Sequence, residues 1–282
     1  MPDKELDIFE RIRNSYHDLT VAERKVADYV LLTGTAIQFM SITQLAEECG
    51  VADATISRFC RTLDLKGFNA FKIELAKLSA SRPAPSSTHA PETIEGRRAE
   101  VCRLAEEAVH QTAELISTDN VQKAVHLFER ATRVVCLGSG GSMIIAHTCA
   151  NLFGTVTNKF TAVPESHSQI SIAATLDPND VIVLFSYSGS TTIGLQILEL
   201  AKSHGVQTVL VTRYIKSPAA KLADVVLCCG ANETPFQSGS VPAKIAQLVV
   251  MDILYQEYRH RNQDACNRQI ERLASALSGT HL

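Results

Sequence analysis

Residues 134–142 read VVCLGSGGS, and residues 181–191 read VIVLFSYSGST. In each stretch, an apolar run typical of a buried strand leads directly into a loop of glycine and hydroxyl residues. Three further β-rich runs, separated by segments of helical periodicity, occupy 160–163, 206–211 and 225–228. Strands that alternate with helices form parallel sheets covered on both faces. The C-terminal part of the chain is therefore predicted to be an α/β domain with a doubly wound, parallel five-stranded sheet.

The two Gly/Ser loops are predicted to bind an anion. In a parallel sheet, ligands bind at the carboxyl ends of the strands, where helix N-termini present backbone N–H groups. Ser142 stands at the start of the helix after the first loop, and Thr191 at the start of the helix after the second. Neutral hydroxyls and amides around helix starts suit a phosphomonoester.

Two other interpretations of these loops stay open. Each loop could be a simple turn between a strand and a helix. The first could instead belong to a dinucleotide site, in which Glu165 would contact the ribose. The dinucleotide pattern lacks its third glycine, because Met143 stands there, and the second loop has no role in it. A Walker A loop is excluded, since no lysine follows the glycines.

The first 78 residues are predicted to form a separate all-α domain. Two capping boxes, at residues 20–23 and 41–44, mark helix starts. Residues 42–63 combine a short helix, a turn at Gly50 and a second helix, which is the spacing of a helix-turn-helix. This pattern predicts a DNA-binding domain, and an ordinary helical bundle with a polar surface is the alternative.

The second helix of this pattern is the predicted DNA-recognition helix. Ile56 and Phe59 would pack it against the first helix, which leaves an outer face of Thr55, Ser57, Arg58, Arg61 and Thr62. Such donors are what contacts to base edges and phosphates require. Residues 55–77 hold five Lys/Arg against two Asp/Glu, whereas residues 1–80 hold ten against twelve. The positive charge is therefore local to the predicted DNA-binding face.

Composition and charge limit the class of protein. The chain has 282 residues, 45% of them hydrophobic, which excludes global disorder. No apolar run approaches the roughly 20 residues of a membrane span, and the charged N-terminus does not resemble a signal peptide, so a cytoplasmic location is expected. The eight cysteines form no CxxC or Cys/His cluster, so we expect reduced thiols and no metal site. The Pro/Ser-rich run SASRPAPSSTHAP opens a predicted linker, 79–96, between domains at 1–78 and 97–282.

The two loops resemble those of a sugar isomerase (SIS) domain, a flavodoxin-like fold with the patterns GxGxS and SxSGxT. Residues 138–142 match the first pattern and residues 186–191 match the second. Together with the N-terminal helix-turn-helix, the whole chain resembles the RpiR/MurR family of bacterial transcription regulators. Further matching stretches are SITQLA (41–46), GV (50–51), TISRF (55–59), KGF (66–68), SGS (238–240), AKIAQL (243–248) and MD (251–252).

Two positions depart from the family pattern. Ala52 replaces the serine that usually precedes the recognition helix, so Asp53 is the expected N-cap. Pro242 and Ala243 replace the usual serine pair near the last loop, which bears on the ligand contacts of that loop.

The resemblance implies a DNA-binding transcription regulator whose DNA affinity is controlled by a phosphorylated sugar bound in the SIS domain, without a cofactor. The implied DNA-binding residues are Ser41, Thr43, Thr55, Ser57, Arg58, Arg61 and Lys66. The implied ligand-binding residues are Ser139, Ser142, Glu165, His167, Ser186, Ser188, Thr191 and Ser240. A homodimer or homotetramer on palindromic double-stranded operator DNA is expected, because closed dimers match palindromes.

A sugar-phosphate isomerase is the alternative function. Moving a proton between adjacent carbons needs an acid/base group, and Glu165 with His167 is the obvious pair near a predicted strand end. The same pair could also hydrogen-bond sugar hydroxyls without turnover. A helix-turn-helix on the same chain is natural for a sensor and hard to explain on an isomerase, so we expect no enzyme activity.

Overall fold

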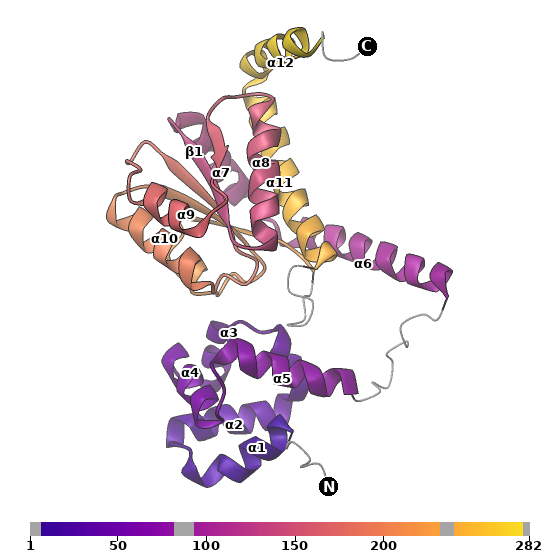
Figure 1. Cartoon of the computed structure of the whole chain (residues 1–282), viewed down its shortest axis with the longest axis vertical. Coiled ribbons are helices and arrows are strands. Elements are labelled where there is room, and N and C mark those ends of the chain that lie inside the picture. The colour runs from indigo at the N-terminus through magenta and orange to yellow at the C-terminus, as the bar shows by residue number, and fades with distance from the viewer. Residues whose placement is uncertain (1–6, 82–92, 232–239, 279–282) are drawn as a thin grey trace. The chain divides into compact units, whose positions relative to one another are not determined.

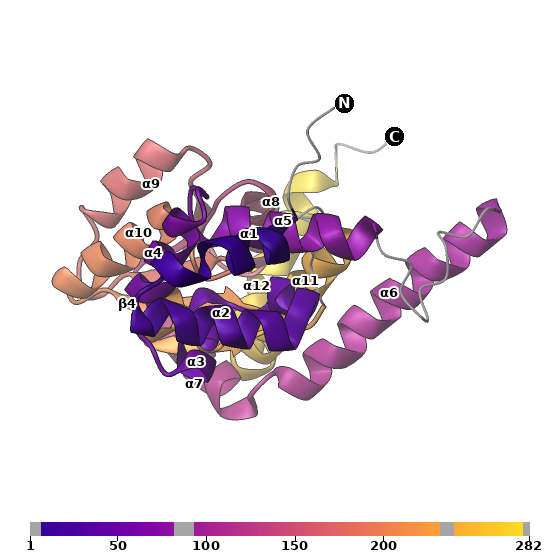
Figure 2. The ribbon, with the colours of Figure 1, turned by 90° about the horizontal axis from the view of Figure 1, so that it is seen from below.

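The computed structural model describes residues 7–81, 93–231 and 240–278 (Figure 1). The chain divides into two compact units and passes from the first to the second within helix α6 (Ile94–Leu115), between Val101 and Cys102. Figures 1 and 2 both show α6 as one uninterrupted helix. The described part of the first unit is helical, and the second is α/β.

The first unit is a helical cluster around one core. Its elements before α6 are α1 (Ile8–Ser15), η1 (Tyr16–Asp18), α2 (Val21–Thr33), η2 (Gly34–Phe39), α3 (Ile42–Cys49), α4 (Asp53–Thr62) and α5 (Phe68–Ser81). Both predicted capping boxes form, because Thr20 and Ser41 accept hydrogen bonds from the backbone N–H groups of Glu23 and Gln44. The core side chains that these helices bury completely include Ile12, Val26, Leu45, Phe59 and Phe71.

The second unit is built on a five-stranded sheet in the order β2-β1-β3-β4-β5, and every neighbouring pair is parallel. The strands are β1 (Val134–Gly138), β2 (Phe160–Ala162), β3 (Val181–Phe185), β4 (Gln207–Thr212) and β5 (Val225–Cys228). The strand order reverses at β1, so the switch point lies between β1 and β3. There, Gly138 is paired with Phe185, which brings the carboxyl ends of these strands side by side.

Helices cover both faces of this sheet, as Figure 1 shows. The elements of the second unit other than α6 and the strands are α7 (Thr118–Arg130), α8 (Gly141–Gly154), α9 (Ser166–Ala173), α10 (Thr192–Ser203), η3 (Ala219–Lys221), α11 (Val241–Arg261) and α12 (Gln263–Leu277). One core joins the sheet to α7, α8 and α11, and a second core joins it to α9 and α10. The predicted doubly wound parallel sheet is therefore confirmed.

The predicted strands agree with the observed ones to within one residue at each end. The predicted linker at 79–96 overlaps two helices, because α5 continues to Ser81 and α6 begins at Ile94. Its middle, 82–92, lies outside the described residues, so the domain boundary stays a prediction.

Candidate functional site

Helices α3 and α4 form the helix-turn-helix of the first unit. Gly50 ends α3 in the left-handed conformation, with φ of 62°, which a residue without Cβ adopts at little cost. Thr43 Oγ1 of α3 donates to Asp53 Oδ2 of α4 at 2.8 Å, which ties the two helices together. The expectation that Asp53 is the N-cap is wrong, because Ala52 occupies that position and Asp53 is the first helical residue.

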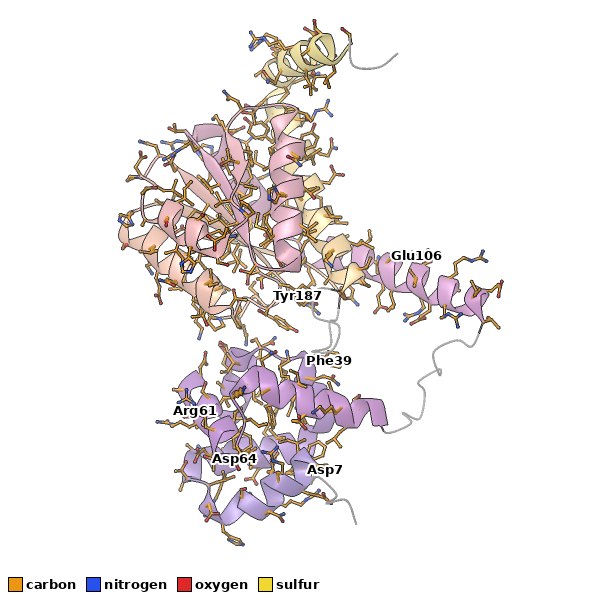
Figure 3. All side chains as sticks on the ribbon, viewed as in Figure 1. Asp7, Phe39, Arg61, Asp64, Glu106 and Tyr187 are labelled. Carbon is orange, nitrogen blue, oxygen red and sulfur yellow. The ribbon has the colours of Figure 1, made fainter. Side chains whose placement is uncertain are left out.

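Basic side chains lie on the outside of α4 and just after it. Arg58, Arg61 and Lys66 are all exposed, and Figure 3 shows Arg61 projecting from the surface of its unit. Ser57 is half-buried, and its hydroxyl donates to the Asp53 carbonyl at 3.3 Å. These four residues are available for contacts to phosphates or base edges.

Three hydroxyls of the predicted DNA-binding set lie inside the protein. The prediction that Thr55 faces outward is wrong, since only 5% of it is exposed and its hydroxyl accepts a hydrogen bond from Arg58. Ser41 is buried as the cap of α3, and Thr43 is buried with its hydroxyl on Asp53. A helix that packs closely on its neighbour buries short side chains beside the apolar residues that join the two helices. Of the three, Thr55 contacts a basic residue of the set, Arg58.

The two Gly/Ser loops leave the sheet at the switch point, each leading into a helix. Neither α8 nor α10 has a side-chain cap, so N–H groups of their first turns are not satisfied by a side chain. Gly140, at φ of 56°, provides the left-handed residue before α8. A Cβ on Gly138 would lie 2.8 Å from the Ser142 carbonyl oxygen, so only glycine allows this close turn from β1 into α8. In α8, the Ser142 and Met143 N–H groups donate to the Ser139 and Gly140 carbonyls, both at 3.1 Å. The positive ends of the two helix dipoles still meet at the switch point and favour an anion there.

The hydroxyls of these loops differ in their surroundings. Ser186 is 6% exposed, and its Oγ is a buried polar atom without a hydrogen-bond partner. Ser188 Oγ accepts from the Ser190 backbone N–H at 3.3 Å. Ser139 and Thr191 are exposed, and Ser142 is half-buried. Thr191 occupies the N-cap position of α10 without making the capping hydrogen bond. A helix-capping role therefore does not account for the hydroxyls of the second loop.

Glu165 and His167 lie at the start of α9, after β2. The Glu165 carboxylate accepts hydrogen bonds from the backbone N–H groups of His167 and Ser168, at 2.9 and 2.8 Å, and so caps the helix. These bonds lower the pKa of Glu165 below its ordinary value. Both side chains are exposed. Ser240 likewise caps a helix, because its Oγ accepts from the Ala243 N–H at the start of α11.

Sequence reasoning missed Gln169. This residue of α9 is 1% exposed, and its amide nitrogen donates to the Gly138 carbonyl at 2.8 Å and to the Val163 carbonyl at 2.9 Å. Gln169 therefore fastens the ends of β1 and β2 beside the first loop. A glutamine on an apolar stretch of helix was the available signal, but its partner Gly138 lies 31 residues away.

Sequence reasoning also missed a close contact behind the second loop. Gly189 has φ of 59°, and a Cβ there would lie 2.1 Å from Ser217 Oγ. The Gly189 carbonyl accepts from the Ala219 N–H at 2.9 Å. The second loop is thus held against the segment after β4, and only glycine fits at this point.

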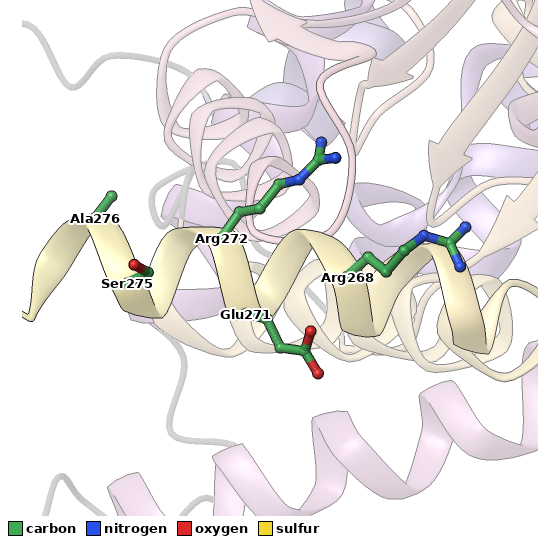
Figure 4. Close-up of a pocket in the computed structure, with 5 residues that line it drawn as sticks. All are labelled: Arg268, Glu271, Arg272, Ser275 and Ala276. Atoms are coloured by element: carbon green, nitrogen blue, oxygen red, sulfur yellow. The ribbon is translucent and has the colours of Figure 1, made fainter.

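A shallow hollow elsewhere on the surface lies along α12. It is lined by Arg268, Glu271, Arg272, Ser275 and Ala276 (Figure 4). All five are exposed residues of one helix, so nothing encloses a ligand there. Within the described residues, no three His, Cys, Asp or Glu side chains gather to hold a metal ion. No helix of that part is long and apolar enough to cross a membrane.

Comparison with known proteins identifies the domain family of each unit. Residues 6–82 match the helix-turn-helix domain of the rpiR family, and residues 127–256 match the SIS domain. The chain belongs to the rpiR family of transcription regulators. The rpiR match spans α1 to α5, with the basic face on α4, and the SIS match contains both Gly/Ser loops.

Relatives of this rpiR-family protein match it along nearly its whole length. An uncharacterized HTH-type transcriptional regulator of Caldanaerobacter subterraneus is 29% identical over 274 residues, which are 96% of this chain and 97% of that protein. The solved structure of the Vibrio vulnificus NanR protein complexed with ManNAc-6P has a TM-score of 0.88 at 22% identity, covering 98% of this chain and 100% of that one. Phosphoheptose isomerase from Neisseria gonorrhoeae has a TM-score of 0.52 at 15% identity, covering 60% of this chain and 100% of the isomerase. At these identities the two structures show a shared fold.

Proposed function

We propose that this protein is a transcription regulator whose DNA affinity is controlled by a phosphorylated sugar bound at the switch point of its SIS domain. The observation that supports this most directly is the buried hydroxyl of Ser186, which has no partner within the protein and lies beside two helix N-termini without side-chain caps. A phosphate group would supply the missing acceptor and would accept from first-turn N–H groups of α10, which no side chain caps. The related NanR protein in complex with ManNAc-6P supports a sugar phosphate as the ligand class.

The proposed ligand site uses the residues of both loops. Ser139, Ser142, Ser188 and Thr191 would surround the phosphate together with Ser186. Glu165 and His167, at the neighbouring end of β2, would meet the sugar hydroxyls. Ser240, whose Oγ accepts from the Ala243 N–H at the start of α11, would also contribute to ligand binding.

The proposed DNA interface is the outer face of α4. Arg58, Arg61 and Lys66 would bind phosphates or guanine edges, and Ser57 would add a hydroxyl at the N-terminal half of the recognition helix. A homodimer or homotetramer would present two such helices to a palindromic operator in the cytoplasm. The sugar phosphate would act by favouring one arrangement of the assembly over another, which changes the DNA affinity.

The alternative function is sugar-phosphate isomerisation, favoured by the shared fold of phosphoheptose isomerase. Glu165 would have to exchange a proton near neutral pH, whereas two backbone hydrogen bonds stabilise its carboxylate and lower its pKa. This makes Glu165 a weak base and supports a sensor without turnover.

One experiment separates the two functions. Purified protein is mixed with ManNAc-6P, fructose 6-phosphate or glucose 6-phosphate, and binding is followed by the rise in melting temperature. DNA fragments selected by the protein from a random pool are then titrated with and without the sugar phosphate that binds. A changed DNA affinity without conversion of the sugar supports the sensor. Conversion of the sugar by a chain that binds no DNA specifically would overturn it.

A further inference from the structure

The backbone of Ala231, just after β5, is hydrogen-bonded to three other parts of the second unit. Its carbonyl accepts hydrogen bonds from Tyr187 Oη at 2.6 Å and from Arg213 Nε at 3.0 Å. Its N–H donates to Gln111 Oε1 of α6 at 3.1 Å. Ala231 has φ of 77°, a conformation that a residue with Cβ adopts only when its surroundings impose it. The hydrogen bonds on both sides of the Ala231 Cα supply that constraint.

Through its carbonyl, Ala231 is joined to the second Gly/Ser loop. Tyr187 stands between Ser186 and Ser188 in that loop, and Figure 3 shows it at the edge of its unit. The Tyr187 carbonyl accepts from the Arg213 N–H at 3.0 Å and from Thr212 Oγ1 at 3.0 Å. The tyrosine is therefore held at both its backbone and its hydroxyl, so a movement of the loop is transmitted to Ala231.

Through its N–H, Ala231 is joined to α6. Thr112 Oγ1 accepts from the Gly230 N–H at 2.9 Å, one residue before the Gln111 contact. A Cβ on Gly230 would lie 2.5 Å from Gln111 Cβ and 2.7 Å from the Thr112 nitrogen, so the backbone approaches the helix as closely as sterics allow. Thr112 and Ala108 of α6 are completely buried here. The C-terminal half of α6 is thus fixed to the end of β5.

We infer that the backbone of Ala231 couples the ligand loop to α6, and that Gln111 is the positioning residue that makes this coupling. The inference rests on the proposed function. Sugar phosphate on Ser186 and Ser188 would fix the position of Tyr187, and Tyr187 would fix the Ala231 carbonyl. Gln111 accepts from the N–H of the same residue, on the other side of its Cα. The chain passes from the first unit to the second within α6, so a change in α6 would act on the DNA-binding unit through the chain itself.

The strained conformation of Ala231 gives this coupling a two-state element. A non-glycine residue at positive φ has a more stable alternative, so hydrogen bonds to its N–H and its carbonyl decide which state is populated. Ligand on the loop strengthens the tyrosine contact and therefore favours the arrangement in which Gln111 also bonds. Because packed contacts of this kind are either made or broken, we expect two discrete states, with and without the Gln111 bond.

The test uses the full chain and the variant Gln111→Leu, with Gln256→Leu as its matched control. Gln111 and Gln256 each donate from Nε2 to a carboxylate one turn earlier, on Glu107 and Asp252, so both variants lose that bond. Only Gln111→Leu also loses the bond to Ala231. Gln111→Glu retains an acceptor oxygen for the Ala231 N–H and serves as the conservative variant.

Three quantities are measured for each variant: the Kd of the sugar phosphate by calorimetry, the Kd of selected DNA with and without it, and hydrogen exchange of residues 102–115. In the parent and in Gln256→Leu, ligand changes both the DNA affinity and the exchange of α6. In Gln111→Leu, ligand binds with a Kd within about threefold of the parent, but its effect on DNA affinity falls roughly three- to tenfold. Gln111→Glu restores most of the effect.

Three results would overturn the inference, and they differ in what else they affect. If Gln111→Leu responds to ligand as strongly as Gln256→Leu does, the coupling does not pass through Ala231, while the proposed function stands. If the parent binds DNA and binds none of the three sugar phosphates, the proposed function and the coupling fail together. Loss of ligand binding in a folded Gln111→Leu would place this residue in the ligand site and would also refute a positioning role.

Discussion

Replacing Ser186 with alanine should weaken ligand binding without lowering the stability of the fold. A buried hydroxyl without a hydrogen bond costs about 1–3 kcal/mol of stability. Removing the Ser186 oxygen removes that cost and leaves a gap of one atom, whose lost contacts offset part of the gain. The free energy of unfolding of Ser186→Ala should therefore be unchanged or raised by up to about 1 kcal/mol.

Ligand binding should fall in the same variant. A hydrogen bond to a charged group contributes about 1.5–3 kcal/mol, so its loss should weaken sugar-phosphate binding roughly 10- to 150-fold. Adding Ser188→Ala should weaken binding further, and the double variant should remain folded and bind DNA without responding to the sugar phosphate.

The matched control is Ser117→Ala in the same unit. Ser117 caps α7 by accepting from the Asn120 N–H, so its loss should cost about 1 kcal/mol. Urea unfolding measures stability, and calorimetry measures the Kd of the sugar phosphate. A Ser186→Ala protein that loses as much stability as Ser117→Ala, yet binds ligand like the parent, would show that the hydroxyl is structural and would refute the proposed pocket.

Three other predictions follow from the described contacts. Arg58→Ala and Arg61→Ala should each weaken specific DNA binding by about 1–3 kcal/mol in fluorescence titrations. If the DNA affinity and its salt dependence are unchanged in both variants, the outer face of α4 is not the DNA interface. Gly189→Ala should abolish ligand binding and lower the melting temperature, because Cβ is strained at φ of 59° and collides with a side chain; calorimetry showing parent-like binding would contradict this. Although burial opposes its charge, hydrogen bonds from Arg133 hold the pKa of Asp180 below its ordinary 3.8, so this carboxylate stabilises the fold at neutral pH and that contribution disappears as pH falls below about 4. Acid unfolding of Asp180→Asn should accordingly depend less on pH in that range than unfolding of the parent does.

Much of the fold could be predicted from the sequence because its signals are local. The capping boxes at Thr20 and Ser41 connect residues three apart, and the alternation of short apolar strands with helices is visible along the chain. Gly50, Gly138 and Gly140 stand where the backbone needs their freedom or small size. The same local signals led to the helix-turn-helix and to both Gly/Ser loops.

The partners of individual side chains were decided by the tertiary structure. Thr55 was expected on the surface, but the packing of α4 buries it, and Ala52 rather than Asp53 precedes that helix as its cap. Helical periodicity gives the direction of a side chain only to within part of a turn, whereas burial depends on how closely the next helix packs.

In the candidate ligand site, too, some features could be predicted from the sequence and others were decided by the tertiary structure. Its loops and hydroxyls were predicted because glycine and serine follow each strand directly. That Ser186 Oγ lacks a partner, that Gln169 fastens Gly138, and that Gln111 reaches Ala231 across 120 residues of sequence could not be predicted. A hydrogen bond between distant segments depends on positions within a few tenths of an ångström, and only the packed sheet with its helices determines those positions.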